Sequence, residues 1–118
     1  MTFYFLSTCT TCKRIMNEVA LPSNTALQDI KKEMYSKEQL EEMRALTGSY
    51  EALFNKRAQK YKQLGLKDKN LSEEQIKEYI LGDYTFLKRP VFIDHENIFI
   101  GNQKKTVESL KIYLEQIS

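Results

Sequence analysis

Hydrophobic and polar residues follow two different periods along the chain, and the changes between them mark the expected elements. The apolar run at residues 2–6 (TFYFL) predicts a buried strand, because it is too short for a helix. After a polar turn at residues 7–11, apolar residues recur at spacings of three and four over residues 13–20, which predicts a helix with one buried face. Residues 21–24 (LPSN) end this helix, and residues 25–30 (TALQDI) predict a second strand.

The middle of the chain changes character, because helix-start signals replace the strand patterns. Residues 36–39 and 72–75 both read Ser-x-x-Gln, the capping-box spacing that opens a helix. We therefore expect two helices that begin at these serines and close at Gly48 and Gly82, with a further helix over residues 50–64. Lys and Glu are dense here, which is typical of a solvated outer face.

Strand patterns return in the last third of the chain. Pro90 precedes an apolar run at residues 91–94, and a turn at residues 95–97 leads into a second run at residues 98–100, which together predict a β-hairpin. A helix marked by apolar residues up to Ile117 follows. This order predicts an α/β fold of thioredoxin-like (glutaredoxin-like) type, with a mixed sheet and a helical insertion before the C-terminal hairpin and helix. Without a linker or repeat, we expect one domain over residues 1–118.

Composition narrows the classes of partner. Lys and Arg number 18 against 16 Asp and Glu, and a net charge of +2 is too weak to indicate direct nucleic-acid binding. The longest apolar runs fall far short of the roughly 20 residues of a membrane span. No basic leader precedes a long apolar stretch, so we expect no signal peptide, no membrane partner and a cytoplasmic location.

Both cysteines of the chain lie in one motif, Cys9-Thr10-Thr11-Cys12. Secreted mini-domains held by disulfides carry more cysteines, and a bridge between Cys9 and Cys12 would close too short a loop to add much stability. The pair therefore indicates chemistry rather than mechanical support. The alternative, half of a zinc site, needs two further Cys or His ligands, and the chain offers only His95, so we expect no metal.

The motif stands where the first strand hands over to the first helix. The N–H groups and the dipole at a helix N-terminus favour a thiolate over a thiol, so Cys9 is the expected nucleophile. Cys12 lies about one turn further, where it can attack a mixed disulfide on Cys9. Thr8 or Cys9 would cap the helix, and Lys13 adds positive charge. We expect the substrate site to be lined by Thr8, Thr10, Thr11 and Lys13.

Arg89 and Pro90 form the second element, at the head of a predicted strand. A proline is tolerated there because no ladder donor is lost. In thioredoxin folds the corresponding proline is cis and lies beside the cysteine motif, where it binds substrate. Arg89 would then face Cys9, where its guanidinium can stabilise a thiolate or bind an oxyanion. The alternative is a surface arginine on a turn.

Four segments together resemble the arsenate reductase (ArsC)/Spx family: STCTTCKR, LFNKRAQKYKQLGL, LKRPVFID and IFIGNQ, in that order. The resemblance covers nearly the whole chain. It implies a thioredoxin-like core with a helical insertion, a nucleophile at Cys9 and an arginine before a cis-proline at Arg89. It also implies that Arg57 approaches the site, although a solvated helix arginine is the alternative.

Departures from the family pattern bear on the activity. Glutathione-dependent arsenate reductases hold arsenate with three arginines around one nucleophilic cysteine, whereas Asn55 stands at the first of these positions and residues 98–102 contain no arginine. The pair Cys9 and Cys12 matches instead the Spx branch, which uses this disulfide as a redox switch and binds RNA polymerase. Gly48 falls near the glycine at that contact.

Three functions are left open by the sequence. The expected one is a thiol–disulfide redox protein with no bound cofactor, which uses Cys9 and Cys12 on a thiol or oxyanion substrate and draws electrons from glutathione or from thioredoxin or glutaredoxin. The alternative is an Spx-like redox-sensing regulator that binds the RNA polymerase alpha subunit. A further alternative is an arsenate reductase.

Overall fold

The computed structural model describes residues 1–117, which pack as two compact units. The first, the sheet unit, combines residues 1–33 with residues 89–117, and the second, the helical unit, spans Met34–Lys88. The helical unit follows the second strand in the chain and precedes the hairpin, as the expected insertion does. The expectation of a single domain over residues 1–118 stays a prediction.

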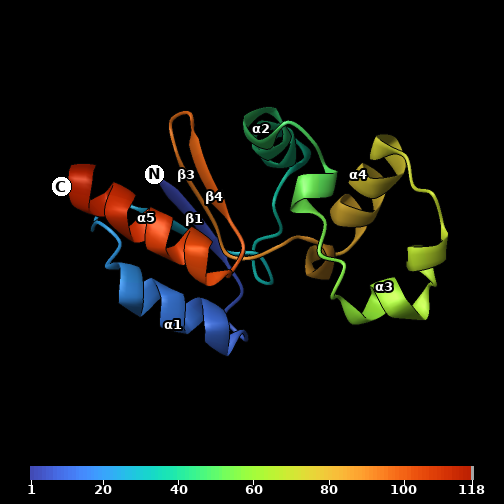
Figure 1. The fold of residues 1–118 in the computed structure, drawn as a ribbon, viewed down its shortest axis with the longest axis horizontal. Helices are drawn as coiled ribbons and strands as arrows, with labels where there is room; N and C mark the ends of the chain where they lie inside the picture. Colours follow the sequence, from blue (N-terminus) through green and yellow to red (C-terminus); the bar gives the residue numbers. More distant parts are fainter. Residues whose placement is uncertain (118) are drawn as a thin grey trace. The chain divides into compact units, whose positions relative to one another are not determined.

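The sheet unit contains a four-stranded mixed sheet (Figure 1). Its strands are β1 (Thr2–Phe5), β2 (Ala26–Asp29), β3 (Val91–Asp94) and β4 (Asn97–Ile100), in the spatial order β2-β1-β3-β4. β1 runs parallel to β2 and antiparallel to β3, and β3 pairs antiparallel with β4. The mixed sheet and the C-terminal hairpin predicted from the sequence are therefore confirmed.

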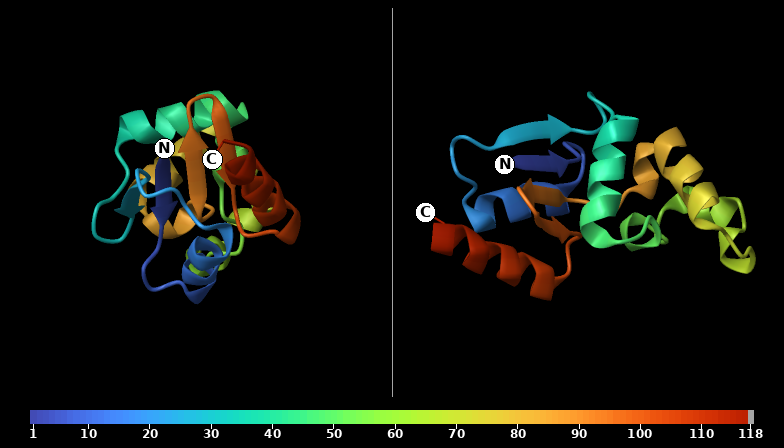
Figure 2. Two further views of the ribbon diagram at one scale, coloured as in Figure 1. Left: turned by 90° about the vertical axis from the view of Figure 1, so that its left-hand side faces the viewer. Right: turned by 90° about the horizontal axis from the view of Figure 1, so that it is seen from above.

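Two helices cover one face of this sheet, α1 (Thr10–Val19) and α5 (Lys104–Ile117) (Figures 1 and 2). Their apolar faces meet alternate residues of the central strands in one core. Its buried members are Phe3, Ile15, Val19, Phe92, Val107, Leu110 and Leu114. Full burial of such a side chain stabilises the fold by roughly 1.5–3 kcal/mol. This core fixes α1 against β1 and β3, and so fixes the loop between β1 and α1.

The helical unit contains α2 (Lys37–Thr47), α3 (Gln59–Gln63) and α4 (Glu73–Gly82), with 3-10 turns η1 (Glu51–Leu53), η2 (Leu66–Asp68) and η3 (Tyr84–Phe86). Both predicted capping boxes are formed, since Ser36 and Ser72 accept from the backbone N–H three residues on and the glutamine there accepts in return. α2 closes at Gly48, whose φ of 95° suits glycine. α4 keeps Gly82 as its last residue and ends at Asp83.

The single helix predicted over residues 50–64 is wrong. Phe54 is extended and forms a β-bridge with Leu87, which divides the segment into η1 and α3. The N–H of Asn55 donates to the carbonyl of Phe86 at 2.7 Å, and the N–H of Lys88 donates to the carbonyl of Leu53 at 2.9 Å. These bonds to a segment about thirty residues away satisfy the backbone groups that a continuous helix would have used.

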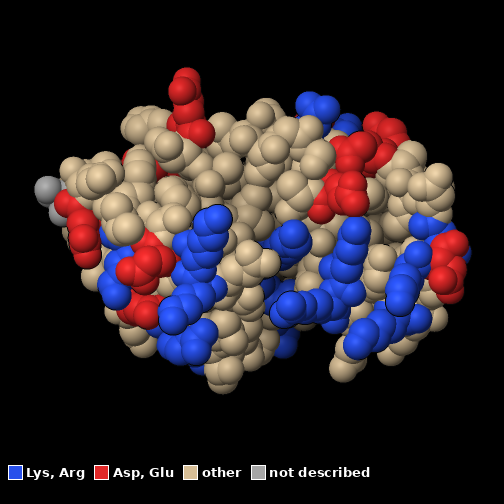
Figure 3. Space-filling view, viewed as in Figure 1, with Lys and Arg blue, Asp and Glu red and all other residues tan. Residues whose placement is uncertain are grey.

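Positive surface charge in the helical unit is concentrated around α3. Figure 3 shows Lys and Arg atoms over α3, and residues 56–69 contain six of them against one acid. Lys56 forms an ion pair with Glu51, and Lys60 forms one with Asp83. The lysines of both pairs are exposed, and pairs near the surface add little stability, so this segment fits the solvated face expected from its composition. Within residues 1–117, no helix has the length and apolar character needed to cross a membrane.

Candidate functional site

The loop between β1 and α1 is a tight turn that places Cys9 at the N-terminus of α1. The N–H of Cys9 donates to the carbonyl of Leu6 at 3.0 Å, which closes the turn. Cys9 itself is extended, with φ −95° and ψ 112°, and its carbonyl accepts from the N–H of Lys13 at 3.3 Å. The helix thus starts at Thr10, three residues before the predicted apolar stripe, and its capping residue is Cys9 rather than Thr8.

The Cys9 sulfur is half-buried at this helix end, in a setting that favours its anion. Burial raises the pKa of Cys9, but the combined effect of the other groups is larger and lowers it below its ordinary value. These groups are the backbone N–H and the thiol of Cys12, the backbone N–H of Thr11 and the charge of Arg89. α1 has no acidic residue in its first turn and no side-chain cap hydrogen bond. The N-terminus is therefore available to the sulfur.

The Cys12 sulfur has the opposite setting one turn further along α1. Its side chain is fully buried, and burial together with the nearby charge of Cys9 raises the pKa of Cys12 to about 11, against weaker lowering by the Leu6 backbone and Arg89. At neutral pH Cys12 is a thiol that donates toward the Cys9 sulfur. One helix end therefore holds a cysteine of lowered pKa beside a cysteine of raised pKa.

Arg89 and Pro90 are the other predicted residues of the site beside Cys9 and Cys12. The Arg89–Pro90 peptide bond is cis, as the sequence predicted. Pro90 is buried, and its carbonyl accepts from the N–H of Gly101 at 2.8 Å, which ties the start of β3 to the end of β4. The half-buried Arg89 lies close enough for its charge to lower the pKa of both Cys9 and Cys12. The structure thus brings together the three residues predicted to carry the chemistry.

The other predicted site residues fall into two groups. Thr8, Thr10 and Lys13 are exposed on the loop and first turn of α1, and Thr11 is half-buried there, so all four surround the Cys9 turn. Arg57 belongs to the helical unit, where it is exposed and its N–H donates to Oδ1 of Asn55 at 3.1 Å. A role for Arg57 at the site stays a prediction.

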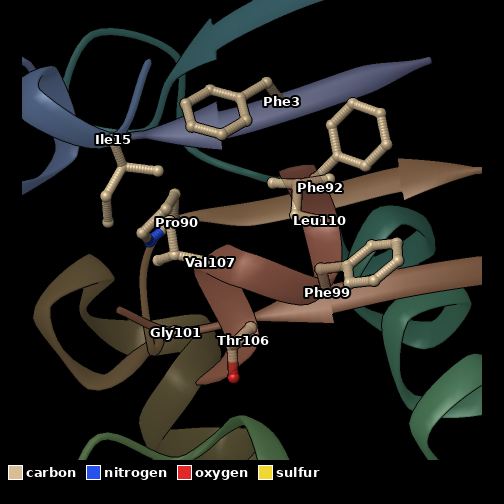
Figure 4. Close-up of a pocket in the computed structure, with 9 residues that line it drawn as sticks. All are labelled: Phe3, Ile15, Pro90, Phe92, Phe99, Gly101, Thr106, Val107 and Leu110. Atoms are coloured by element: carbon tan, nitrogen blue, oxygen red, sulfur yellow. The ribbon is translucent and has the colours of Figure 1, made fainter. Parts of the chain in front are cut away.

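The core side of Pro90 has no room for a ligand. A cavity of about 10 Å³ lies there, lined by Pro90 and by side chains of β1, β3, α1 and α5 (Figure 4). This volume corresponds to about one water molecule. A reacting group must therefore reach Cys9 from the solvent side of the turn.

In residues 1–117 no group of three or more His, Cys, Asp and Glu side chains is arranged to hold a metal ion.

One residue at this site was missed by the sequence analysis. Asp29, the last residue of β2, accepts a hydrogen bond from the N–H of Ser7 at 3.2 Å and so contacts the Cys9 turn. The bond spans 22 residues, and the only local signal was a carboxylate at the end of a predicted strand.

Comparisons with known proteins agree with this fold. The chain combines a thioredoxin-like fold with a cysteine of lowered pKa at the first helix end, and the ArsC family matches residues 4–110 of the chain. The chain belongs to the ArsC family. It is 26% identical over 120 residues to the uncharacterized protein YusI of Bacillus subtilis (strain 168), covering 92% of this chain and 95% of that protein.

Solved structures support the same fold. SACOL0876 of Staphylococcus aureus COL superposes with a TM-score of 0.71 at 27% identity, covering 92% of this chain and 95% of that one. Arsenate reductase from Vibrio cholerae superposes with a TM-score of 0.75, covering 93% and 98%. The latter is 16% identical, so its likeness concerns the fold alone.

Proposed function

We propose that this protein is a thiol–disulfide reductase that uses Cys9 as nucleophile and Cys12 as resolving thiol. The observation that carries the proposal is the opposite direction of the two pKa shifts at one helix end. A lowered pKa gives Cys9 the thiolate that attacks, and a pKa of about 11 keeps Cys12 protonated until a disulfide forms beside it.

The reaction proceeds by two exchanges. The Cys9 thiolate attacks one sulfur of a substrate disulfide, the substrate S–S bond breaks, and the departing thiolate takes a proton. The Cys12 thiol then loses its proton and attacks the Cys9 sulfur of the mixed disulfide, which releases the second substrate thiol. Two electrons have passed to the substrate, and the protein holds a Cys9–Cys12 disulfide. A dithiol such as thioredoxin or glutaredoxin, or two glutathione molecules, would restore both thiols.

Arg89 and Pro90 have distinct roles in this proposal. The Arg89 guanidinium stabilises the Cys9 thiolate, in line with its effect on the Cys9 pKa. Pro90 offers one wall of the site, with Thr8, Thr10, Thr11 and Lys13 along the exposed side for a thiol or oxyanion substrate. Arsenate is disfavoured because Asn55 and residues 98–102 supply none of the further guanidinium groups that would offset the desolvation of a multiply charged oxyanion.

The second candidate is a redox-responsive regulator of Spx type that binds the RNA polymerase alpha subunit. It would form the same Cys9–Cys12 disulfide, but as a signal rather than a step of turnover. The observation in its favour is the exposed Gly48 at the end of α2, which falls near the glycine that the Spx branch uses at that contact. A regulator would bind polymerase with an affinity that changes on oxidation, and it would show no turnover.

A turnover assay tests the first candidate. A glutathione mixed disulfide or a small aromatic disulfide is the substrate, and NADPH consumption is followed through either the thioredoxin or the glutathione system. We expect turnover that Cys9→Ser abolishes, and that Cys12→Ser stops at a mixed disulfide detectable by mass. Ser109→Ala, an exposed change on α5, is the matched control. Turnover that persists in Cys9→Ser contradicts the proposal.

The same assay with arsenate separates the third candidate. With glutathione and glutaredoxin present, we expect little NADPH consumption. Robust arsenate-dependent turnover that disappears in Cys9→Ser would show that the missing arginines are dispensable and that the protein is an arsenate reductase.

A further inference from the structure

Asp29 connects the ends of the two parallel strands. It lies beside Phe5 in the register, and the N–H of Ile30 donates to the carbonyl of Phe5 at 2.9 Å. Beyond that bond, the carboxylate of Asp29 accepts the next hydrogen bonds. Its Oδ1 accepts from the N–H of Ser7 and from the N–H of Lys31, both at 3.2 Å. One oxygen thus links the segment after β1 to the segment after β2.

The contact on Ser7 matters because Ser7 lies inside the turn that carries the nucleophile. That turn is closed by the bond from the Cys9 N–H to the Leu6 carbonyl, and Ser7 is two residues before Cys9. The hydroxyl of Ser7 and then the N–H groups of Ser7 and Lys31 outweigh partial desolvation and hold the pKa of Asp29 below its usual range. The carboxylate is therefore ionised at neutral pH, and a charged acceptor makes the stronger hydrogen bond.

We propose that Asp29 is a positioning residue for the Cys9 thiolate, acting through the turn of residues 6–9. By holding the Ser7 N–H, it fixes the turn from the side of β2, while the Cys9–Leu6 bond fixes it from within. The Cys9 sulfur is thereby kept at the N–H groups of Thr11 and Cys12, which favour its anion. The proposal rests on the proposed function, in which this thiolate is the attacking group.

Two substitutions distinguish this positional role from a direct effect of the Asp29 charge on Cys9. Asp29→Asn removes the negative charge but keeps an acceptor oxygen in the place of Oδ1. Asp29→Ala removes both. If the carboxylate acted on Cys9 by its charge, Asp29→Asn would make the thiolate more stable, because a nearby negative charge disfavours a second one. If it acts by position, Asp29→Asn resembles the wild type and Asp29→Ala does not.

The experiment measures the second-order rate of Cys9 alkylation by iodoacetamide between pH 5 and pH 9, with the labelled peptide identified by mass. We expect Asp29→Ala to slow the reaction at pH 7 by about two- to fivefold, the range of a lost contact at a helix terminus, and to move its midpoint to higher pH. Asp29→Asn should restore the wild-type profile. Asp68→Ala, at an exposed carboxylate of the helical unit, is the control and should leave the profile unchanged.

Thermal melts of the same variants complete the test. A lower melting temperature in Asp29→Ala with an unchanged alkylation profile would mean that Asp29 is only structural, and would overturn the proposal. Faster alkylation in Asp29→Asn would overturn it in favour of a charge effect. If Asp29→Ala does not fold, Asp29→Ser takes its place, since its short hydroxyl cannot span to Ser7 and is better tolerated at a half-exposed position.

The alkylation profile needs no substrate, so the two proposals can fail separately. A protein without reductase turnover whose alkylation slows in Asp29→Ala would contradict the proposed function and support the role of Asp29. A working reductase in which Asp29→Ala leaves both kcat/KM and alkylation unchanged would do the reverse.

Discussion

Two kinds of helix N-terminus occur in this protein. The one at α1 in the sheet unit differs from those at α2 and α4 in the helical unit in its capping residue and in the charge of its first turn. α2 and α4 begin at serines whose hydroxyls accept from the backbone N–H three residues on, and each has glutamate in its first turn, Glu38 in α2 and Glu73 and Glu74 in α4. α1 begins at a cysteine, with no side-chain cap hydrogen bond and no acid in its first turn. α1 thus lacks a side-chain cap at the end where the pKa of Cys9 is lowered.

The same contrast extends to the polar groups around these helix ends. In the helical unit they support the backbone: the Glu73 carboxylate accepts from the N–H groups of Tyr50 and Glu51 at 2.7 and 3.1 Å. In the sheet unit, Arg89 and the N–H groups of Thr11 and Cys12 act on one sulfur. A capping serine uses the N–H groups of a helix end to stabilise the fold, whereas a cysteine at the same position has its pKa lowered by them.

The largest expected effect comes from giving α1 the same capping residue as α2 and α4, a serine. Cys9→Ser places a preferred capping residue there, and its hydroxyl can accept from the N–H of Thr11 or Cys12. We expect alkylation at position 9 and reductase turnover to disappear, while the free energy of unfolding rises by about 0.5–1 kcal/mol. Chemical denaturation and labelling of the same sample check both. A variant less stable than the wild type would mean that the cysteine contributes more to the fold than a cap does.

The next effect compares the two sulfurs of the one helix. With a pKa of about 11, Cys12 is thiolate in only about one molecule in 10⁴ at pH 7. The alkylation rate of Cys9 should rise with pH only up to its lowered pKa and then level, whereas that of Cys12 should keep rising to about pH 11. Peptide mass mapping after short exposure to iodoacetamide at pH 7 should find the label on Cys9. Label mainly on Cys12 would reverse the two roles.

A smaller effect tests the contribution of Arg89. Its positive charge lowers the pKa of Cys9, so Arg89→Ala should raise that pKa and slow alkylation at pH 7 by about two- to fivefold, the strength of a partly exposed charge pair. Arg89→Lys keeps the charge and is the matched control. Thiolate absorbance near 240 nm as a function of pH reads the change directly. An Arg89→Ala titration that coincides with the wild type would confine Arg89 to a role in binding.

Local patterns predicted the elements whose ends are set by nearby residues. The apolar run of β1, the spacing along α1 and both Ser-x-x-Gln boxes carried enough information. The break at Phe54 was not predictable in this way, because its bridge to Leu87 depends on residues far along the chain. Burial on β2 was also unexpected: Leu27 is 54% exposed, while Gln28 is buried and donates to the carbonyl of Glu33 at 3.1 Å.

The residues of the candidate site also separate into those with a local sequence signal and those that depend on long-range contacts. Cys9 and Cys12 were found because their spacing and their place before a helix are local features. Arg89 and Pro90 needed the fold-level expectation that a cis-proline faces the first helix. Asp29 and Ser7 were missed, because only the parallel pairing of β1 with β2 brings a carboxylate to a turn 22 residues away.

The smallest effect removes a cap instead of adding one. Ser72→Ala deletes the hydroxyl that accepts from the N–H of Gln75 at 3.2 Å, and an exposed N-cap of this kind is worth about 1 kcal/mol. We expect the melting temperature to fall by about 4 °C. Alkylation of Cys9 should stay at the wild-type rate, because the α4 cap supports the backbone and touches no reactive group. Ser109→Ala on α5, which caps nothing, is the control and should change stability by less than about 0.5 kcal/mol. Slower alkylation of Cys9 in Ser72→Ala at a temperature where the protein is fully folded would break the separation between the two kinds of helix end.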